Sequence, residues 1–332
     1  MASYIVRRIL YMFVLLLILS FVSFVIIQLP PGDFLSTLVI NMENRGMTID
    51  AETIADLKKR YGLDKPFMGQ YLTWLFNLLQ GDMGRSFQWD EEVTKLIGER
   101  LILTTTLAIS SLILVYLIAV PIGIYSATHQ YSFADYTFTV FGFIGLATPN
   151  FLLALILMFL TVKLFGWSPG GLFSREYIMA DWSLGKVVDL LKHLPVPLIV
   201  ISTAGTAAII RVLRGSLLDE LAKQYVVTAR SKGVREQRIL FKYPVRIAIN
   251  PIISSIGGLL PFIVSGEVLV SIVLGLPTIG PLLILALTDQ DMFLAGSMVM
   301  MLGGLAMIGT LISDLLLVTI DPRIRFSAAA RA

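Results

Sequence analysis

Cysteine is absent from this chain of 332 residues, and histidine occurs only twice. Without cysteine the chain forms no disulfide bond, no thiolate metal site and no cysteine nucleophile, although this absence fixes no redox compartment. The histidines, His129 and His193, lie too far apart in the sequence to form a local metal motif such as HExxH. We therefore expect no metal site in this chain.

Signatures of nucleotide hydrolysis and acyl transfer are also missing. No GxxxxGK[ST] motif occurs, and the only Gly-Lys pair, Gly185-Lys186, lacks the upstream glycine and the following Ser or Thr. No GxSxG motif supports a hydrolase. We expect no catalytic residue and no cofactor in this chain, so that any ATP and Mg²⁺ would be bound by partner proteins.

Charge is scarce, because Asp, Glu, Lys and Arg make up 15% of the residues and hydrophobic types 56%. A soluble domain carries about 25% charged residues, so this composition indicates an integral membrane protein. Apolar runs long enough to span a bilayer cover roughly residues 9–29, 101–124, 137–165, 194–213, 247–274 and 293–319. Because the runs are continuous rather than alternating, the sequence predicts an all-α protein with six transmembrane helices.

The first apolar run follows two arginines, as in a signal peptide. It is about as long as a spanning helix and is followed by QLPPGD instead of a small-residue cleavage site, so we interpret it as a retained span. This gives an N-terminal stub and first span at 1–29, an exported loop at 30–100 and a five-span core at 101–332.

The distribution of charge predicts the orientation. Residues 211–246 contain nine basic and three acidic residues, whereas the loop at 30–100 contains eight basic and eleven acidic ones. The N-terminal stub and the tail from Asp321 are also positive. The positive-inside rule therefore places both termini and the 211–246 segment in the cytoplasm, with the chain crossing the membrane several times.

Short amphipathic helices are expected in the exported loop. Asp50 is a good N-cap for a helix over AETIADLKKRY, which Gly62 would end. The following stretch PFMGQYLTWLFNLL places apolar side chains at helical spacing. This second helix suits either the outer membrane surface or packing on the ends of the spans.

The stretch QYVVTARSKGVREQRILFKYP, Gln224 to Pro244, is basic and helix-like but not apolar enough for the membrane. Gly233 interrupts it, and glycine tolerates the positive φ of a sharp bend. A helix–glycine–helix elbow favours docking of a cytoplasmic partner, because a rigid knuckle suits force transfer. A basic collar on anionic lipid is the alternative, whereas nucleic acid is not an expected partner.

These residues, extended to QYVVTARSKGVREQRILFKYPVRIAINP, resemble the cytoplasmic "EAA" loop of ABC importer permeases of the peptide type. Four further stretches are similar to the same family in the same order: MASYIVRRIL, YGLDKPFMGQYLTWLFNLLQGDMGRSF, GEVLVSIVLGLPTIGPLLILAL and DPRIR. The resemblance covers nearly the whole chain and is closest to the first permease subunit of dipeptide, oligopeptide and nickel systems. It implies the type I ABC importer permease fold and a multi-pass location in the inner membrane of a bacterial cell.

The resemblance also implies a mechanism. In this family the loop forms a coupling helix held in a cleft of an ATPase subunit. Two ATPase subunits, a homologous second permease and an external substrate-binding protein complete the transporter. Carried over to this sequence, the ATPase-coupling residues are Gln224, Tyr225, Ala229, Arg230, Gly233 and Pro244. Gln224 stands where an acidic residue is common, which puts an ion pair with the ATPase at that position in doubt.

Other residues are singled out by their position in the apolar runs. Glu267 lies deep in PFIVSGEVLVSIVL, where an ionisable group indicates the translocation path, the seam with the second permease, or a hydrogen-bonded packing role. In GLPTIGP, Gly275, Pro277 and Gly280 exclude a straight helix and, by resemblance, form a scoop that closes the outer cavity; a simple re-entrant turn is the alternative.

Prolines and histidines carry weaker expectations. Pro121, Pro149 and Pro261 lie inside predicted spans and should kink them. His129 and His193 are expected to be ordinary surface residues.

Other functions remain as alternatives at this point. A gradient-driven secondary transporter would need paired carboxylates at the midplane, and Glu267 is the only candidate. A membrane receptor or scaffold would need no partner permease. Within the peptide-type group, peptides are the first choice of substrate, and oligosaccharides, opines and nickel chelates are the alternatives.

Overall fold

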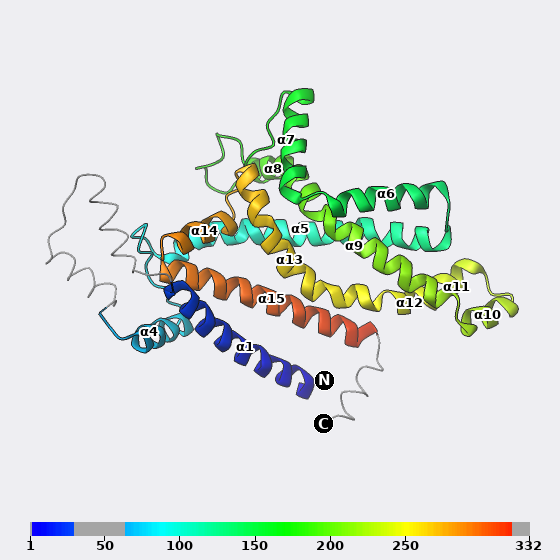
Figure 1. The fold of residues 1–332 in the computed structure, drawn as a ribbon, viewed down its shortest axis with the longest axis horizontal. Helices are drawn as coiled ribbons and strands as arrows, with labels where there is room; N and C mark the ends of the chain where they lie inside the picture. The colour runs from blue at the N-terminus through cyan, green and yellow to red at the C-terminus, as the bar shows by residue number, and fades with distance from the viewer. Residues whose placement is uncertain (1, 30–63, 321–332) are drawn as a thin grey trace. The chain divides into compact units, whose positions relative to one another are not determined.

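The computed structural model describes residues 2–29 and 64–320, without the side chains of residues 2–5, 99, 258, 260–267 and 317–320. In these ranges the chain is helical and forms no strand beyond an isolated bridge between Arg85 and Glu92. The helices are α1 (Ala2–Gln28), α4 (Phe67–Leu79), α5 (Val93–Thr128), α6 (Phe133–Ala147), α7 (Asn150–Phe165), α8 (Leu184–His193), α9 (Pro195–Leu221), α10 (Gln224–Ser231), α11 (Glu236–Lys242), α12 (Pro244–Ala248), α13 (Asn250–Leu274), α14 (Ile279–Thr288) and α15 (Met292–Ile320) (Figure 1).

The all-α class is therefore confirmed. By length and apolar composition, five helical stretches of the described chain can cross a membrane, or up to seven if each of two bent helix pairs forms one span. The predicted number of six lies within this range. Two predicted spans are longer than their apolar runs, because α5 and α9 continue as helices through the polar residues that flank them.

The sequence predicted that Pro149 would kink a continuous helix, and this prediction is wrong. Pro149 precedes Asn150 as the N-cap of α7, so that α6 and α7 are separate helices bent by 107°. The physical reason is that proline disfavours helical conformation in the residue before it, and Thr148 is in the extended region (ψ 120°). Pro121, by contrast, lies within the continuous helix α5.

The chain divides into two compact units, and the predicted three-part division stays a prediction. One unit contains residues 2–104 and 278–304, and its core joins α1, α4, α14 and the first half of α15. Tyr71 and Trp74 are buried against Phe24, so the inner face of α4 packs on α1. The predicted helix over 51–61 with its Asp50 cap lies outside the described residues.

Asp291 organises the loop of this unit. Its carboxylate is fully buried and accepts hydrogen bonds from the Ser86 hydroxyl, from the backbone N–H of Phe87 (2.8 Å) and from that of Gln88 (3.2 Å). Its other oxygen accepts from the N–H of Leu294 (3.1 Å) and thereby caps α15. One side chain thus fixes the 86–88 loop to the start of a spanning helix.

The other unit contains residues 105–277 and the second half of α15, and α9 is its central helix. α9 packs against α6, α7, α12 and α13. The approach of α6 is close because Gly145 faces Thr203, whose Cγ2 would lie 2.6 Å from a Cβ added at the glycine. Near the other end of α9, buried Leu213 and Leu217 share a core with Val245 of α12 and Ile252 of α13.

Candidate functional site: the α10–α11 hook

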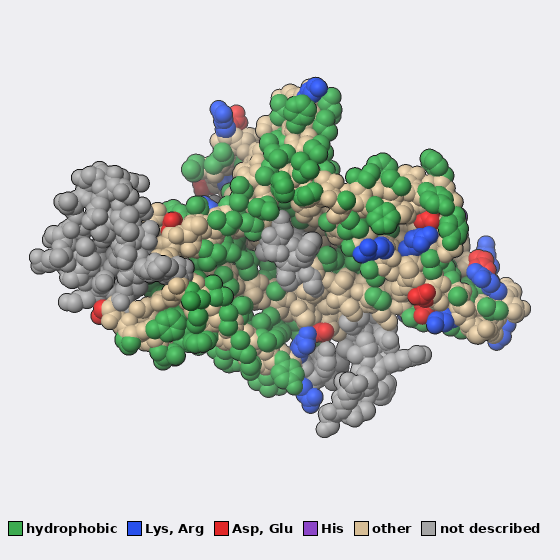
Figure 2. Space-filling view, in the orientation of Figure 1, with side chains coloured by type: hydrophobic (Ala, Val, Ile, Leu, Met, Phe, Trp, Pro, Cys, Tyr) green, Lys and Arg blue, Asp and Glu red, His purple; other side chains and the backbone are tan. Residues whose placement is uncertain are grey.

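α10 and α11 follow the C-terminal end of α9 and lie at one end of this unit, whereas α12 packs against α9 (Figure 1). Lysine and arginine side chains gather over this end (Figure 2). We call residues 224–242, which comprise α10, the bend at Gly233 and α11, the hook. Its exposed basic residues are Arg230, Lys232, Arg235, Arg238 and Lys242.

Gly233 forms the predicted elbow. Its φ is +70°, a left-handed conformation in which glycine has no side chain to strain. The N–H of Gly233 donates to the Arg230 carbonyl (2.9 Å), and the N–H of Val234 donates to the Ala229 carbonyl (3.3 Å). These two bonds make a Schellman motif, which satisfies the last carbonyls of α10 and fixes the direction in which the chain leaves it.

An ion pair bridges the elbow from outside. Arg230 on α10 contacts Glu236 on α11 through its Nε (2.7 Å) and its Nη2 (3.2 Å). Both side chains are about half exposed or more, at 49% and 66%, so the pair contributes only about 0–1 kcal/mol. The backbone motif therefore sets the shape of the hook, and the ion pair adds little to it.

Tyr225 anchors the hook to α9. Its hydroxyl donates a hydrogen bond of 2.6 Å to Glu220 in the last turn of α9. Burial raises the pKa of the Tyr225 phenol, and the neighbouring Glu220 carboxylate raises it further, so the donor proton stays on the oxygen at neutral pH. The ring of Tyr225 also lies 6.4 Å from that of Tyr243, beyond the far end of α11.

The second arm of the hook is shorter than the sequence predicted. The helix begins at Glu236 rather than directly after Gly233, and it ends at Lys242. Pro244 then occupies the first turn of α12, a favourable position because its missing N–H would have no partner there. Pro244 is buried and is followed by Val245 in the core shared with α9 and α13. The base of the hook is therefore packed against two long helices, α9 and α13.

The side chains predicted for ATPase coupling differ in exposure. Gln224, Arg230 and Gly233 are exposed and form the outer surface of the hook, whereas Tyr225 and Ala229 are partly buried and Pro244 is buried. The structure thus gathers the first five on the hook and assigns Pro244 to its base.

Sequence reasoning missed an ion pair beside the hook. Arg214 on α9 forms a bidentate contact with Asp135 in the first turn of α6, with Nε–Oδ1 at 3.1 Å and Nη2–Oδ2 at 2.9 Å. Asp135 is buried and also accepts from the N–H of Tyr131 (3.0 Å). The pair ties the α5–α6 turn to α9. No local pattern signals it, because its partners are 79 positions apart.

The family resemblance predicts a helical hook on a core of spanning helices, as the structure shows. Comparison with known proteins tests whether the chain belongs to that family. Residues 119–326 match the family described as "Binding-protein-dependent transport system inner membrane component". Residues 1–108 match the N-terminal component of the same kind of transport protein. The chain belongs to this family.

The chain is similar to peptide permeases over nearly its full length. It is 37% identical to the oligopeptide transport system permease protein AppB of Bacillus subtilis, over 98% of this chain and 100% of that protein. It is 34% identical to a putative peptide permease of Brucella ovis (98% and 99%) and 30% identical to OppB of Salmonella typhimurium (98% and 100%). The predicted family and the permease subunit of a peptide-type ABC importer are therefore confirmed.

The stretch predicted to form the scoop of the permease is only partly non-helical. Gly275, with φ +64°, ends α13, and Pro277 is exposed in the connection that follows. Gly280, which the sequence placed in the turn, lies in the first turn of α14. The N–H of Gly171 donates to the Leu274 carbonyl (2.6 Å), so the 166–183 loop is attached to the end of α13.

The structure bears differently on the predictions for Glu267 and His193. Glu267 lies within α13, but its side chain is outside the described residues, so its predicted role on the path or seam stays a prediction. His193 is not a surface residue as expected: it is 5% exposed, and its Nδ1 lies 2.9 Å from the Asp189 carbonyl. The reason is that α8 turns His193 and the polar residues Lys186 and Asp189 inward and leaves Leu184 and Leu191 outside.

Proposed function

We propose that this permease forms half of the pathway of an ATP-driven peptide importer and that its hook is the part gripped by an ATPase subunit. The observation that carries the proposal is the Schellman-closed hook, whose outer surface is polar while its base enters the core of α9 and α13. The expected partners are a homologous second permease, two ATPase subunits that bind ATP and Mg²⁺, and an external binding protein. The positive segment 211–246 supports a cytoplasmic hook and cytoplasmic termini.

The absence of cysteine allows a direct test of docking, because a single introduced cysteine is unique in the chain. Ala229→Cys and Gln237→Cys place thiols on the two arms of the hook. We expect either thiol to cross-link to a cysteine in the cleft of the ATPase in the assembled complex. Met179→Cys, on an exposed residue of the 166–183 loop on the predicted outer side, is the matched control and should give no such product. Cross-linking of the hook only to lipid probes would contradict docking and favour the lipid collar.

The substrate is proposed from the relatives, several of which carry the name oligopeptide permease. Purification of the partner binding protein and mass spectrometry of its bound ligand test this point. A bound oligosaccharide, opine or nickel chelate would overturn the peptide assignment and leave the ABC mechanism intact.

The energy source is tested separately from the substrate. We expect uptake into proteoliposomes to continue when ionophores collapse the ion gradients while ATP is present inside. Uptake that stops under these conditions would instead indicate a gradient-driven transporter.

A further inference from the structure

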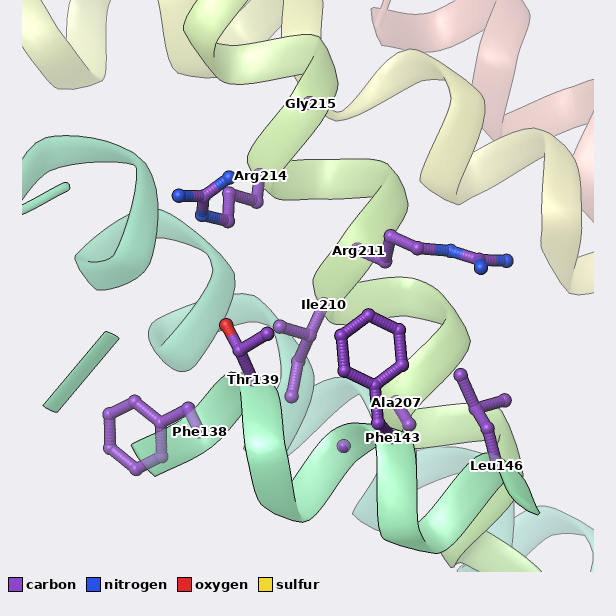
Figure 3. Close-up of a pocket in the computed structure, with 10 residues that line it drawn as sticks. Phe138, Thr139, Phe143, Leu146, Ala207, Ile210, Arg211, Arg214 and Gly215 are labelled. Atoms are coloured by element: carbon purple, nitrogen blue, oxygen red, sulfur yellow. The ribbon is translucent and has the colours of Figure 1, made fainter. Parts of the chain in front are cut away.

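An apolar pocket opens between α6 and α9 (Figure 3). Its volume is about 290 Å³, and Phe138, Phe143 and Leu146 of α6 and Ile210 of α9 form much of its wall. A second cavity of about 220 Å³ shares Phe138 and Ile210 with it and continues along α9 towards Ile199. The second cavity is lined by α5 as well as by α6 and α9, so it is a separate apolar cavity beside the first.

Of the two arginines that line the pocket, one has no charged partner in the described part of the chain. Arg211 and Arg214 both line the pocket, but their guanidinium groups point to opposite sides (Figure 3). Arg214 is neutralised by Asp135, as described above. Arg211 extends over the side of Phe143 and is exposed, and among the side chains that the structure describes it has no hydrogen-bond or ion-pair partner. An arginine is always charged at physiological pH, so this end of the pocket attracts an anion.

We propose that the pocket is a binding site for an anionic phospholipid, with the phosphate at Arg211 and an acyl chain against the apolar wall that α6 and α9 form. Basic pockets between spanning helices on the cytoplasmic side bind anionic head groups in this way. This location rests on the proposed orientation, in which the C-terminal part of α9 lies at the cytoplasmic leaflet. The apolar walls of the pocket favour an acyl chain over a small soluble anion, which would leave those walls uncovered.

The surface of α6 beside the pocket supports this occupant. Val140, Phe141 and Ile144 are 54%, 68% and 56% exposed, so the apolar wall continues onto an outward apolar face. A lipid in the pocket would thus remain in contact with the acyl chains around the helix. Arg211 would hold it there by charge, since the hydrophobic effect does not distinguish one lipid tail from another.

The experiment measures lipid retained by the complete transporter, purified in a zwitterionic detergent from membranes that contain phosphatidylglycerol and cardiolipin. Mass spectrometry counts anionic phospholipids per complex. We expect Arg211→Gln to lower retention about fivefold, since one basic residue near the surface contributes about 1 kcal/mol to attraction of anionic lipid. Arg246→Gln removes the same charge from an exposed position on α12, outside the pocket, and should retain lipid like the wild type.

Three outcomes would overturn the proposal. Equal retention by the wild type and the Arg211 variant would show that the pocket holds no anionic lipid. Equal losses in the Arg211 and Arg246 variants would indicate a diffuse basic collar. Efficient cross-linking of a cysteine at Leu146 to the second permease would show that protein covers the pocket. None of these outcomes depends on the identity of the transported substrate or on ATPase docking.

Discussion

Replacement of Gly233 by alanine tests whether the hook must keep its backbone conformation. Gly233 has φ +70°, and a Cβ added there would meet no heavy atom of the described chain within 4 Å. The cost of the substitution in the isolated permease is therefore the left-handed conformation alone, about 1–2 kcal/mol for an L-residue. A change of this size lowers the population of the bent hook, relative to its alternatives, by a factor of about 5–30.

The assay is the number of ATP molecules hydrolysed per substrate molecule imported by the complete transporter in proteoliposomes. We expect Gly233→Ala to raise this number several-fold and Gly233→Val to raise it further, because a β-branched side chain resists positive φ more strongly. Membrane insertion should be unchanged, since the residue is exposed and lies outside the core. Gly233→Asn is the matched control: it adds a Cβ but tolerates the left-handed region, so its ratio should stay near that of the wild type.

A valine variant that imports substrate with the same ATP consumption as the wild type would refute the reasoning. Equal defects in the alanine and asparagine variants would have a different meaning. They would show that the added Cβ collides with the bound ATPase and that backbone strain is not the cause.

Three further substitutions test the contacts around the hook and in the other unit. Asp135→Asn should lower the free energy of unfolding by about 1.5–3 kcal/mol, because Arg214 loses its charged acceptor; an unchanged melting temperature of the purified complex would contradict this. Tyr225→Phe should cost about 1 kcal/mol at neutral pH through the lost bond to Glu220. Since the folded pKa of Tyr225 is raised, this contribution is complete below pH of about 10 and is lost as the pH rises further, so unfolding of wild type and variant should converge there. A difference that stays constant into alkaline pH would argue against it. Asp291→Asn turns an N–H₂ group towards N–H donors and should cost about 1–3 kcal/mol, seen as faster hydrogen exchange at residues 86–88.

The hook could be predicted from the sequence because its geometry is local. Gly233 stands between two helix-forming stretches, and the hydrogen bonds that close the bend all come from residues 229–234. The exact start of α11 was missed by two residues, since Val234 and Arg235 belong to the bend. Local backbone chemistry therefore predicted the shape of the hook. Only the family resemblance indicated an ATPase subunit as its partner.

Tertiary contacts could not be predicted in the same way. The pairing of Asp135 with Arg214 depends on how α6 packs on α9, which no spacing rule gives. His193 is buried because the polar face of α8 points into the protein and its apolar residues Leu184 and Leu191 point outward. Charge and hydropathy alone would place the polar face in solvent. The break before Asn150 was predicted only as a kink, since the interruption by Thr148, Pro149 and Asn150 is short and apolar residues flank it on both sides.

Because of the break between α6 and α7, we expect this part of the protein to be sensitive to the thickness of the bilayer. α6 and α7 have 15 and 16 residues, so they are about 22 and 24 Å long at 1.5 Å per residue. Each is shorter than the ~30 Å of hydrocarbon in a typical membrane. A bend of 107° prevents both from following the membrane normal, so the pair reaches less far across the bilayer than the sum of their lengths. Lipids with shorter acyl chains should therefore suit this part of the permease better than lipids with longer ones.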